Sequence, residues 1–556
     1  MNNAFRMYQA ERSRMLTRGF VAALLVSTCL SKQALAQENK PLPSFEQLEV
    51  AGAIIGQVLV DNQNIFDLDD PKENNFLYRF ANTLHIRTRA GVIRRILLFK
   101  PGDPVLLQRI EESERLLQNT AYIYEVLIRP VAYSDGIVDI EVITRDTWTL
   151  DPGLGFSRRG GENTSKYGLK ELNLIGTGAA IEWQREEGER GKTDGYQFNN
   201  DLVFGTRSRF NFTYIDGYDG TSQSISLVRP FFALDSRWSA GLFGSTSDRL
   251  ISTYNNNVVT SQYRRQRNTT SIFGGLSGGL VNGWTRRYSL GLDYLDENNE
   301  LVAGAPPPDQ LPVDEIQVAP FVRFEVIQDQ FVKTTNRDQV ARPEFFLLGF
   351  STNIKLGYAS TALGSTRPAW NYAAALNQGW DLSRDRILVA KAAAAGLYAD
   401  GKEEDRLFSG SFEYYVPQSN RAQTYVAIKG DSASDVTQSN QLSIGGENGL
   451  AGYPANYQTG DTRVLLSLEQ RLYSDWYPFR LFRVGGGAFV DIGRAWGGDD
   501  TNNVDRDWLA SVGFGLRIFS VRSAFGTVWR LDIAFPIDPE GDVPSYQIQF
   551  YRTVGF

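Results

Sequence analysis

The sequence predicts a mainly β fold: an antiparallel transmembrane β-barrel of about 16 strands, preceded by one small α/β domain. Three observations support this prediction. Apolar and charged residues alternate along segment after segment of the C-terminal three-quarters of the chain. A targeting segment stands at the N-terminus, and the last segment is aromatic. A membrane barrel alternates in this way because its apolar face meets lipid while its polar face lines the interior.

Residues 1–36 have the pattern of a signal peptide. Basic residues, an apolar run and a small-residue cleavage site follow one another: Arg12, Arg14 and Arg18, then Gly19–Leu30, then Ala34-Leu35-Ala36. We expect this segment to be removed, and residues 37–50 to form a short linker. The alternative is a lipoprotein signal cleaved before Cys29, although Thr28 is a poor residue at the position before such a cysteine.

Removal of residues 1–36 leaves an acidic chain without cysteine. The only cysteine and all three methionines lie in that segment, together with five basic residues and one acidic residue, so the net charge changes from −7 to −11. A chain without cysteine forms no disulfide in an oxidising compartment. The acidic charge argues against nucleic acid as a partner. No run of about 18 apolar residues follows the N-terminal segment, so no transmembrane helix is predicted.

Residues 51–146 have the mixed pattern of a small α/β domain. Ile54–Asn62 is expected to be a strand, whereas Arg89–Phe99 fits either a helix or a buried strand. A helix should follow, with Asp103 as its N-cap and Pro104 as its first residue. Two alternating strands then flank a turn at Asp135-Gly136.

Residues 147–556 contain short alternating segments and no confident helix. Between Asn440 and Asp491, for example, one face of a segment is apolar and the other is polar: Val464, Leu466, Leu468 and Leu472 against Arg463, Ser467, Glu469 and Arg471. About 410 residues, at roughly 25 for each strand and its connection, give about 16 strands, an even number as in bacterial barrels.

A soluble β-sandwich also alternates, so the two architectures must be compared. Charged residues recur on one face of successive segments: Arg463, Glu469, Arg471, Asp491, Arg517, Arg530 and Asp532. Their burial in a dry sandwich core would cost several kcal/mol each, whereas a water-filled barrel accommodates them easily. If stacked sandwiches turned these charges to solvent instead, Trp529 and Phe535 would be core residues.

The residue inventory predicts neither an enzyme nor a cofactor. His85 is the only histidine and lies in the α/β domain, so the barrel has no histidine that could act as a general base. Zinc sites built from cysteine and histidine are excluded. The acidic pairs Asp499-Asp500 and Glu403-Glu404 could bind Ca²⁺ loosely, but solvated loops explain them better.

Four motifs occur along the barrel after the α/β pattern of Ile54–Thr144: Glu171–Gly178, Arg229–Phe232, Gly445–Tyr453 and Phe489–Gly493. In their order and spacing they resemble the POTRA-domain-containing superfamily of outer-membrane β-barrels, which includes BamA/TamA-like assembly factors and two-partner-secretion transporters. The first motif looks like the opening hairpin of that family, and the second is similar to a recurring early-barrel segment. The resemblance covers nearly all of the mature chain and identifies residues 51–146 as a POTRA-like domain.

The resemblance implies a loop that folds back into the barrel lumen. Its motif residues here are Gly445, Gly446, Leu450, Ala451, Gly452 and Tyr453. A strand with Phe489, Asp491 and Gly493 would receive it. In the family an arginine of this loop usually meets an acidic residue of the wall, and Ala451 stands in its place. We therefore expect Arg517 or Arg471 to pair with Asp491 instead.

Two further sites follow from the resemblance. The last strand of such barrels is read by the barrel-assembly machinery, and the corresponding residues here are Tyr546, Ile548, Phe550 and Phe556, although Arg552 and Gly555 interrupt the pattern. A POTRA-like domain can add an extended client to a sheet edge. The candidate edge is the segment with Tyr122, Tyr124, Val126 and Ile128, which could equally be an internal strand.

The resemblance implies insertion or translocation of proteins at the bacterial outer membrane, with the POTRA-like domain in the periplasm. The expected partners are outer-membrane lipids, unfolded or extended protein clients and the barrel-assembly machinery. Opening of the seam between the first and last strands would accompany client pairing. The alternative is a structural barrel or passive pore that keeps the family fold without insertase activity, and Ala451 favours it. A lipid-exporting role is not distinguished by the sequence.

Overall fold

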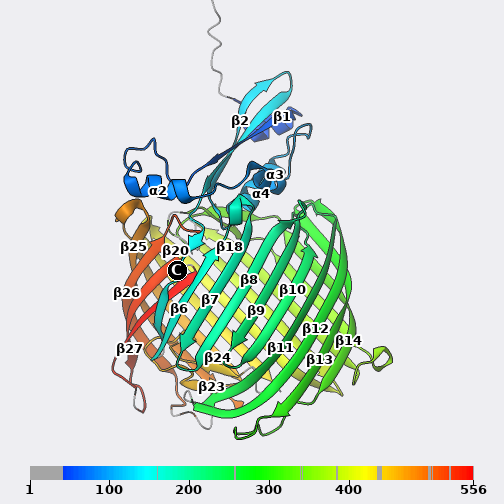
Figure 1. Cartoon of the computed structure of the whole chain (residues 1–556), viewed down its shortest axis with the longest axis vertical. Helices are drawn as coiled ribbons and strands as arrows, with labels where there is room; N and C mark the ends of the chain where they lie inside the picture. Colours follow the sequence, from blue (N-terminus) through cyan, green and yellow to red (C-terminus); the bar gives the residue numbers. More distant parts are fainter. Residues whose placement is uncertain are drawn as a thin grey trace, which may run out of the picture.

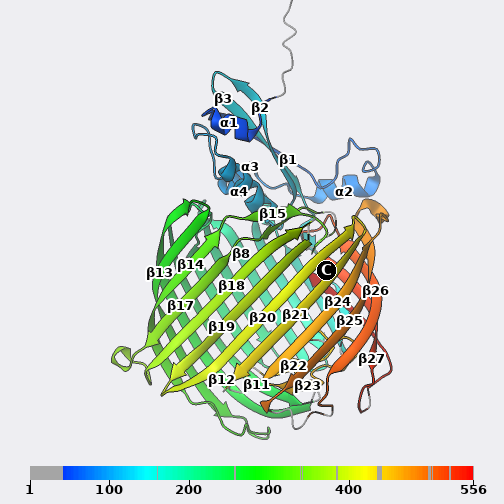
Figure 2. The same cartoon turned by 180° about the vertical axis from the view of Figure 1, so that it is seen from behind.

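The computed structural model has a small α/β domain seated on one end of a closed antiparallel β-barrel (Figure 1, Figure 2). It describes residues 42–556 except 160, 256–257, 338–339, 341, 384–385, 435–440, 447, 499–502, 504, 525–526, 542 and 555–556. The expected signal peptide, Asp499-Asp500 and Phe556 lie outside the described residues. We call the barrel end next to the α/β domain the domain end, and the opposite one the far end.

The α/β domain is a three-stranded sheet covered by helices. Its elements are α1 (Phe45–Val50), β1 (Ile54–Gln63), α2 (Phe76–Leu84), α3 (Ala90–Ile96), α4 (Leu107–Gln118), β2 (Ile123–Ser134) and β3 (Ile137–Asp146). The sheet order is β1-β3-β2, with β1 parallel and β2 antiparallel to β3. Buried Ile93, Ile110 and Leu117 join the two helices α3 and α4 to the core of the sheet.

Three local details of this domain differ from the prediction or settle an alternative that it left open. Within the segment Arg89–Phe99, residues Ala90–Ile96 form a helix, α3. The helix expected to begin at Asp103-Pro104 begins instead at Leu107, because the preceding residues pair in extended form with the start of β1: Ile55 donates its backbone N–H to the Asp103 carbonyl at 2.9 Å. Part of the expected linker forms α1, which begins with a capping box from Ser44 and Gln47.

The barrel strands run in sequence order around the closed wall. They are β4 (Leu150–Asp151), β5 (Gly155–Arg159), β6 (Glu162–Glu171), β7 (Ala179–Gly188), β8 (Gly191–Val203), β9 (Ser208–Gly217), β10 (Gly220–Arg229), β11 (Trp238–Asn255), β12 (Val258–Val281), β13 (Trp284–Leu301), β14 (Glu315–Gln328), β17 (Ser351–Ala359), β18 (Ala369–Ser383), β19 (Arg386–Ala399), β20 (Lys402–Ser419), β21 (Ala422–Ser434), β24 (Thr462–Tyr473), β25 (Phe482–Trp496), β26 (Leu509–Ser520), β27 (Thr527–Ile537) and β28 (Gln547–Val554).

The prediction of 16 strands is wrong: the described residues form a barrel of 20 strands. In this count β4 and β5 are two parts of one strand, since both pair with β6. The connections between strands are shorter than the prediction assumed, so the same length of chain forms more strands. Several hairpins close through two residues only, such as Asn282-Gly283 and Asp400-Gly401, in which both residues have positive φ as type I′ turns require.

The two faces of the wall are divided as the alternation predicts. Leu468 and Leu472 on β24 are about half exposed on the outer surface, whereas Glu469 and Arg471 between them point inward and are buried. The same division holds on β27, where Asp532 is buried inside and Leu531 is exposed outside. Because the sheet closes on itself, the sandwich alternative does not apply.

Two small hairpins leave the wall. β15 (Phe331–Thr334) and β16 (Glu344–Leu347) pair with each other at the domain end between β14 and β17 (Figure 2). β22 (Leu442–Ile444) and β23 (Gln458–Gly460) pair between β21 and β24. Three 3-10 turns complete the described elements: η1 (Leu174–Gly176), η2 (Thr361–Leu363) and η4 (Pro478–Arg480). Among the helices of the described residues, none has both the length and the apolar character needed to cross a bilayer.

Candidate functional site: the barrel lumen, its inserted loop and its seam

The β22–β23 loop packs against the inner wall of β25 and β26. Four of its side chains form a buried apolar cluster with two wall residues: Ile444, Leu450, Tyr453 and Tyr457, with Ala495 and Leu509. Hydrogen bonds fix the same contact. The Tyr453 hydroxyl donates to the carbonyls of Ala510 at 3.1 Å and Ile537 at 3.3 Å. The loop is therefore bound to three consecutive strands, β25 to β27, near their far ends.

The glycines of the loop motif serve close backbone approach. A β-carbon on Gly445 would lie 2.2 Å from the Pro454 carbonyl oxygen. Gly446 donates its backbone N–H to the Tyr453 carbonyl at 3.0 Å, so the hairpin closes on itself. Gly452 has φ +92° and lies beside Pro536 of β27. Ala451, at the place of the family arginine, stands half-buried in this tip.

The wall residues expected to receive the loop are only partly brought together. Gly493 touches it directly, because a β-carbon there would lie 2.3 Å from Cδ1 of Ile444. Phe489 is buried four residues nearer the domain end, next to Gly513 of β26. Asp491 lies between them and is buried. Within the described ranges its carboxylate makes no ion pair, so the expected pairing with Arg517 or Arg471 is not found.

Both arginines instead join a cluster of charges nearer the domain end. The centre of this cluster is Glu469, which accepts from Arg517 at 3.1 Å and is paired with Arg471 at 3.2 Å and Arg530 at 3.3 Å. Arg517 also pairs with Asp532. Arg517 is completely buried and Asp532 nearly so. Two carboxylates and three guanidinium groups thus join β24, β26 and β27 across the inner wall.

Alternation in the sequence predicts that these charges lie on the inner face, but it does not identify Glu469, Arg530 or Asp532 as site residues. Their side chains meet only because β24, β25, β26 and β27 are adjacent in this register. Glu469 faces Phe489 of β25, and Arg517 faces Arg530 of β27. With this register, Arg517 and Asp532 are diagonal neighbours on adjacent strands, and such neighbours lie within reach of long side chains.

A segment missed by the sequence analysis crosses the domain end of the lumen. We call residues 329–350 the crossing segment; it includes the β15–β16 hairpin. On β24, five strands along the wall from β17, Arg471 donates to its Arg337 carbonyl at 2.9 Å and Tyr473 donates to its Asn336 carbonyl at 2.9 Å. Val340 packs there against the buried side chains of Tyr473, Phe519, Val521 and Val528. The segment spans from β14 and β17 to β24.

The crossing segment also binds the α/β domain. Arg342 is buried and donates to the Ile123 carbonyl at 2.7 Å. Lys333 pairs with Glu114 of α4 at 2.6 Å, and the Arg115 guanidinium lies 3.6 Å from the centre of the Phe331 ring. Helix α4 therefore lies between the crossing segment and the barrel rim. The domain and the segment together cover this end of the lumen.

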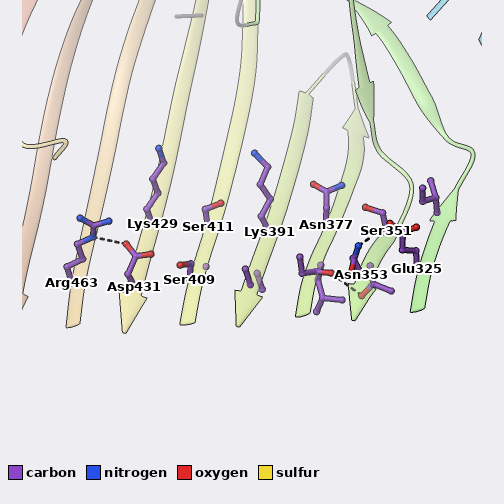
Figure 3. Close-up of a pocket in the computed structure, with 17 residues that line it drawn as sticks. Glu325, Ser351, Asn353, Asn377, Lys391, Ser409, Ser411, Lys429, Asp431 and Arg463 are labelled. Carbon is purple, nitrogen blue, oxygen red and sulfur yellow. Dashed lines mark hydrogen bonds and ion pairs between the residues drawn. The ribbon is translucent and has the colours of Figure 1, made fainter. Parts of the chain in front are cut away.

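Between the crossing segment and the far end, the lumen wall is polar. A cavity of about 620 Å³ faces strands β14 to β24. Figure 3 shows Lys391 and Lys429 pointing from the wall, Arg463 paired with Asp431 at 2.7 Å, and Asn353 donating to Glu325 at 3.0 Å. These side chains suit a hydrated interior, as the sequence analysis predicted.

The seam between the first and last strands is weakly paired. The register between β28 and β5 includes one pair among the described residues, Phe550 with Arg158, whereas β28 matches β27 at eight positions. Pro152-Gly153 interrupts the first strand between β4 and β5, and Pro152 has no N–H to donate. Arg552 pairs with Asp151 across the seam at 2.9 Å.

The C-terminal residues of the expected assembly signal form part of this seam. Tyr546 and Ile548 are about half exposed on the outer face, and Phe550 holds the single register pair with the first strand. Phe556 cannot be placed, since it lies outside the described residues.

The expected client-binding strand is an edge strand, because β2 ends the sheet order β1-β3-β2. Its side chains are less available to a client than expected, because Tyr122, Val126 and Ile128 are buried. The register is irregular at Tyr124, and the side chain of Ile123 also lies in the core. Arg342 and Gln118 occupy the carbonyls of Ile123 and Tyr124. The part of the edge that stays accessible is the outer half of β2, which contains Pro130.

The single histidine lies in the α/β domain. The side chain of His85 is buried, and its Nε2 lies 2.9 Å from a carboxylate oxygen of Asp146. Across the described part of the chain, no group of three or more His, Cys, Asp and Glu residues is placed to hold a metal ion.

A model of the Omp85 superfamily domain matches residues 173–555, which leaves out the α/β domain and strands β4 to β6. Among solved structures, CdiB from Acinetobacter baumannii is 11% identical, with a TM-score of 0.47 over 91% of this chain and 74% of that chain. CdiB from Escherichia coli is 14% identical, with a TM-score of 0.46 over 90% and 76%.

BamA from Haemophilus ducreyi lacking POTRA domains 1–3 is 15% identical, with a TM-score of 0.37 over 89% of this chain and 84% of that chain. A comparison with curated proteins found no match.

Proposed function

Because this chain belongs to the Omp85 superfamily, we propose that it inserts or translocates proteins at the bacterial outer membrane. The observation that carries the proposal is the weak seam between β5 and β28. The α/β domain is a POTRA-like domain in the periplasm, and the far end of the barrel faces the cell exterior.

Opening of this seam requires little disruption of the wall. A backbone hydrogen bond contributes about 0.5–1.5 kcal/mol net, so a seam with one register pair separates far more easily than neighbouring strands with eight or more. The freed edges of β5 and β28 expose backbone donors and acceptors. An extended client segment can add to such an edge by β-augmentation.

The two sides of the seam differ in stiffness. On the C-terminal side, the inserted loop binds β25, β26 and β27, and the cluster around Glu469 joins β24, β26 and β27. On the N-terminal side, the first strand is short and interrupted at Pro152-Gly153. We infer that β4 to β6 move while β24 to β28 stay in place.

The α/β domain would deliver the client. The outer half of β2 is an open sheet edge, and the β2–β3 hairpin projects away from the barrel (Figure 1). Pro130 in this strand limits pairing to part of the edge. The buried side chains Tyr122, Val126 and Ile128 support the sheet and do not meet the client themselves.

A passive pore is the second candidate, and the cavity in the lumen, with Lys391, Lys429 and Arg463 in its lining, favours it. The crossing segment argues against it, because it spans the domain end of the lumen and is bound on both sides. Conductance in a planar bilayer distinguishes the two. A steady, large and ungated conductance would favour the pore.

The seam proposal is tested by a disulfide between the facing positions in the double variant Arg158→Cys/Phe550→Cys. The sequence has no other cysteine outside the expected signal peptide. The matched control Ile533→Cys/Ile548→Cys joins β27 to β28 and does not cross the seam. Each variant replaces the native protein in cells, and the outer-membrane proteome and secreted fraction are compared under oxidising and reducing conditions.

We expect the oxidised seam variant to lose proteins from the outer membrane and the secreted fraction, as cells without this protein would, and the reduced form to restore them, while the control is normal in both states. Normal function of the fully oxidised seam variant would refute the proposal. Loss of function in both redox states would trace the defect to the substitutions, and Arg158→Cys/Phe550→Ser then separates that effect from the cross-link.

A further inference from the structure

Helix α2 carries an apolar face that the protein leaves uncovered. Phe76, Leu77, Phe80 and Leu84 recur at spacings of three to four residues or lie beside one another, so they occupy one side of the helix. Each of the four is more than half exposed, and Phe76 is 77% exposed. Phe76 and Phe80 are stacked on each other, with ring centroids 6.2 Å apart. A contiguous face of this kind marks an interaction surface.

The opposite side of α2 is firmly held, so the exposed face is not the result of a loose helix. Tyr78 is buried and stacks on Phe66, with ring centroids 4.2 Å apart. Its hydroxyl donates to the carbonyl of Phe479 in the turn between β24 and β25. Asn82 binds both the N–H and the carbonyl of Phe66, at 3.1 and 2.9 Å. Asn75 caps the helix through the Tyr78 N–H.

These contacts place α2 on the rim of the barrel, beside the seam. Figure 1 and Figure 2 both show it above β25 and β26 and not above the centre of the lumen. A cavity of about 460 Å³ separates it from the wall, lined by Leu77, Phe80, Leu154, Phe482 and Trp529 among others. Leu154 is 78% exposed on the outside of the first strand. The apolar face of α2 thus continues the outer surface of the barrel.

The neighbouring turn has the composition of a membrane interface. Trp476 and Phe479 are both largely exposed at the domain end. Aromatic side chains gather at this level in membrane barrels, where the hydrocarbon meets the headgroups. Arg79 and Arg87 are exposed on or just after α2, away from its apolar face. Basic residues beside an apolar face are typical of helices that lie in the interface.

We propose that α2 is an interfacial membrane helix: its apolar face inserts into the lipid leaflet on the domain side of the bilayer, and acyl chains fill the cavity beneath it. The occupant is lipid because apolar residues of the cavity connect the helix through Leu154 and Trp529 to the lipid-facing wall. The helix then fixes the α/β domain to the bilayer next to the first strand. This inference does not depend on what passes through the barrel.

Site-specific fluorescence in liposomes tests the proposal, and the absence of other cysteines in the mature chain makes each introduced thiol unique. Phe80→Cys, Arg79→Cys and Val50→Cys are labelled with a nitrobenzoxadiazole dye and reconstituted into phosphatidylethanolamine and phosphatidylglycerol. Val50 is the matched control, because it is 91% exposed on the same domain but belongs to α1, away from the rim. Heat-modifiable mobility in gels verifies that each barrel is folded.

Lipids with a nitroxide group on the acyl chain should quench the label at position 80 at least about twofold, since an interfacial helix buries its apolar face about 5–10 Å deep. The label at position 79 should be quenched more by headgroup nitroxides, and the label at position 50 by neither. Equal, unquenched emission from positions 80 and 50 in a folded barrel would overturn the proposal. Capture of a protein by a photocrosslinker at position 80, with no acyl-chain quenching, would also overturn it.

Discussion

The Cδ1 atom of Ile444 occupies the space next to Gly493 where a side chain would begin, since a β-carbon added there would lie 2.3 Å from it. This contact brings the inserted loop into direct touch with the backbone of β25. The Val464 carbonyl and Leu465 close the same space at 3.0 and 3.3 Å.

We expect Gly493→Ala to weaken the docking of the loop. The added methyl must displace Ile444 from the cluster it forms with Tyr453 and Leu509, and overpacking of this kind costs about 1–3 kcal/mol. Chymotrypsin added to reconstituted protein should then cut the loop faster at Tyr453 or Tyr457. Gly486→Ala is the control, because its β-carbon would find no atom closer than 3.4 Å. Equal cleavage of the two variants would contradict the role of this contact.

Glu469→Gln should destabilise the barrel strongly. It leaves Arg471, Arg517 and Arg530 with one fewer carboxylate in a region from which water is excluded. Removal of one partner from a buried charge cluster costs on the order of 3 kcal/mol or more. Urea-induced unfolding in lipid measures the change.

The control for this substitution is Glu413→Gln, which breaks the pair with Lys391 on the hydrated wall. Because the lysine side chain is half exposed, the loss there should stay below about 1 kcal/mol. Similar unfolding midpoints for the two variants would show that the Glu469 cluster is hydrated and weak.

Deletion of residues 331–347, which removes the β15–β16 hairpin and most of the crossing segment, should open the lumen. The anchors at Arg471, Tyr473 and Ile123 are then lost together. We expect single-channel conductance in planar bilayers to rise several-fold. Deletion of residues 304–312, a loop at the far end, is the matched control and should leave the conductance low. An unchanged conductance after the first deletion would mean that another part of the chain closes the lumen.

Glu73→Ala should loosen the domain at the rim. Glu73 is buried and accepts from Arg522 at 2.8 Å and Arg480 at 3.2 Å, both on barrel turns, and from the Asp67 N–H at 2.8 Å. Loss of hydrogen bonds to a charged group costs about 1.5–3 kcal/mol each, so amide exchange of residues 66–84 should accelerate about tenfold or more. Glu141→Ala, which breaks an exposed pair with Arg129, should leave that segment unchanged. Slow exchange in both variants would show that the aromatic contacts of Tyr78 hold the domain without Glu73.

Several features of the site could be predicted from local sequence. The inward direction of Glu469, Arg471, Arg517 and Asp532 follows from period-2 alternation, which each strand carries by itself. The docking of the loop motif at Gly493 is consistent with the resemblance. The wrong strand number has a local cause as well: two-residue turns such as Asn282-Gly283 leave more of the chain for strands than roughly 25 residues per strand allow.

The partner of each charge could not be predicted. Arg517 meets Glu469 and not Asp491, and alternation places all three on one face without saying which are neighbours. That choice depends on strand register and on the side-chain reach across β24, β25 and β26. Among the described residues Asp491 makes no ion pair, while Arg471 and Arg517 of the wall join the cluster around Glu469.

Local sequence was enough to predict a barrel with an apolar outside and a charged inside, preceded by a small domain, because alternation and turn residues act over a few neighbouring positions. The closure at 20 strands, the crossing segment over the lumen and the position of α2 beside the seam emerged only from the folded chain. Each of these depends on contacts between residues far apart in the chain, such as Tyr78 with Phe479 and Arg471 with Arg337. Such contacts form only when the sheet has closed and brought its ends together.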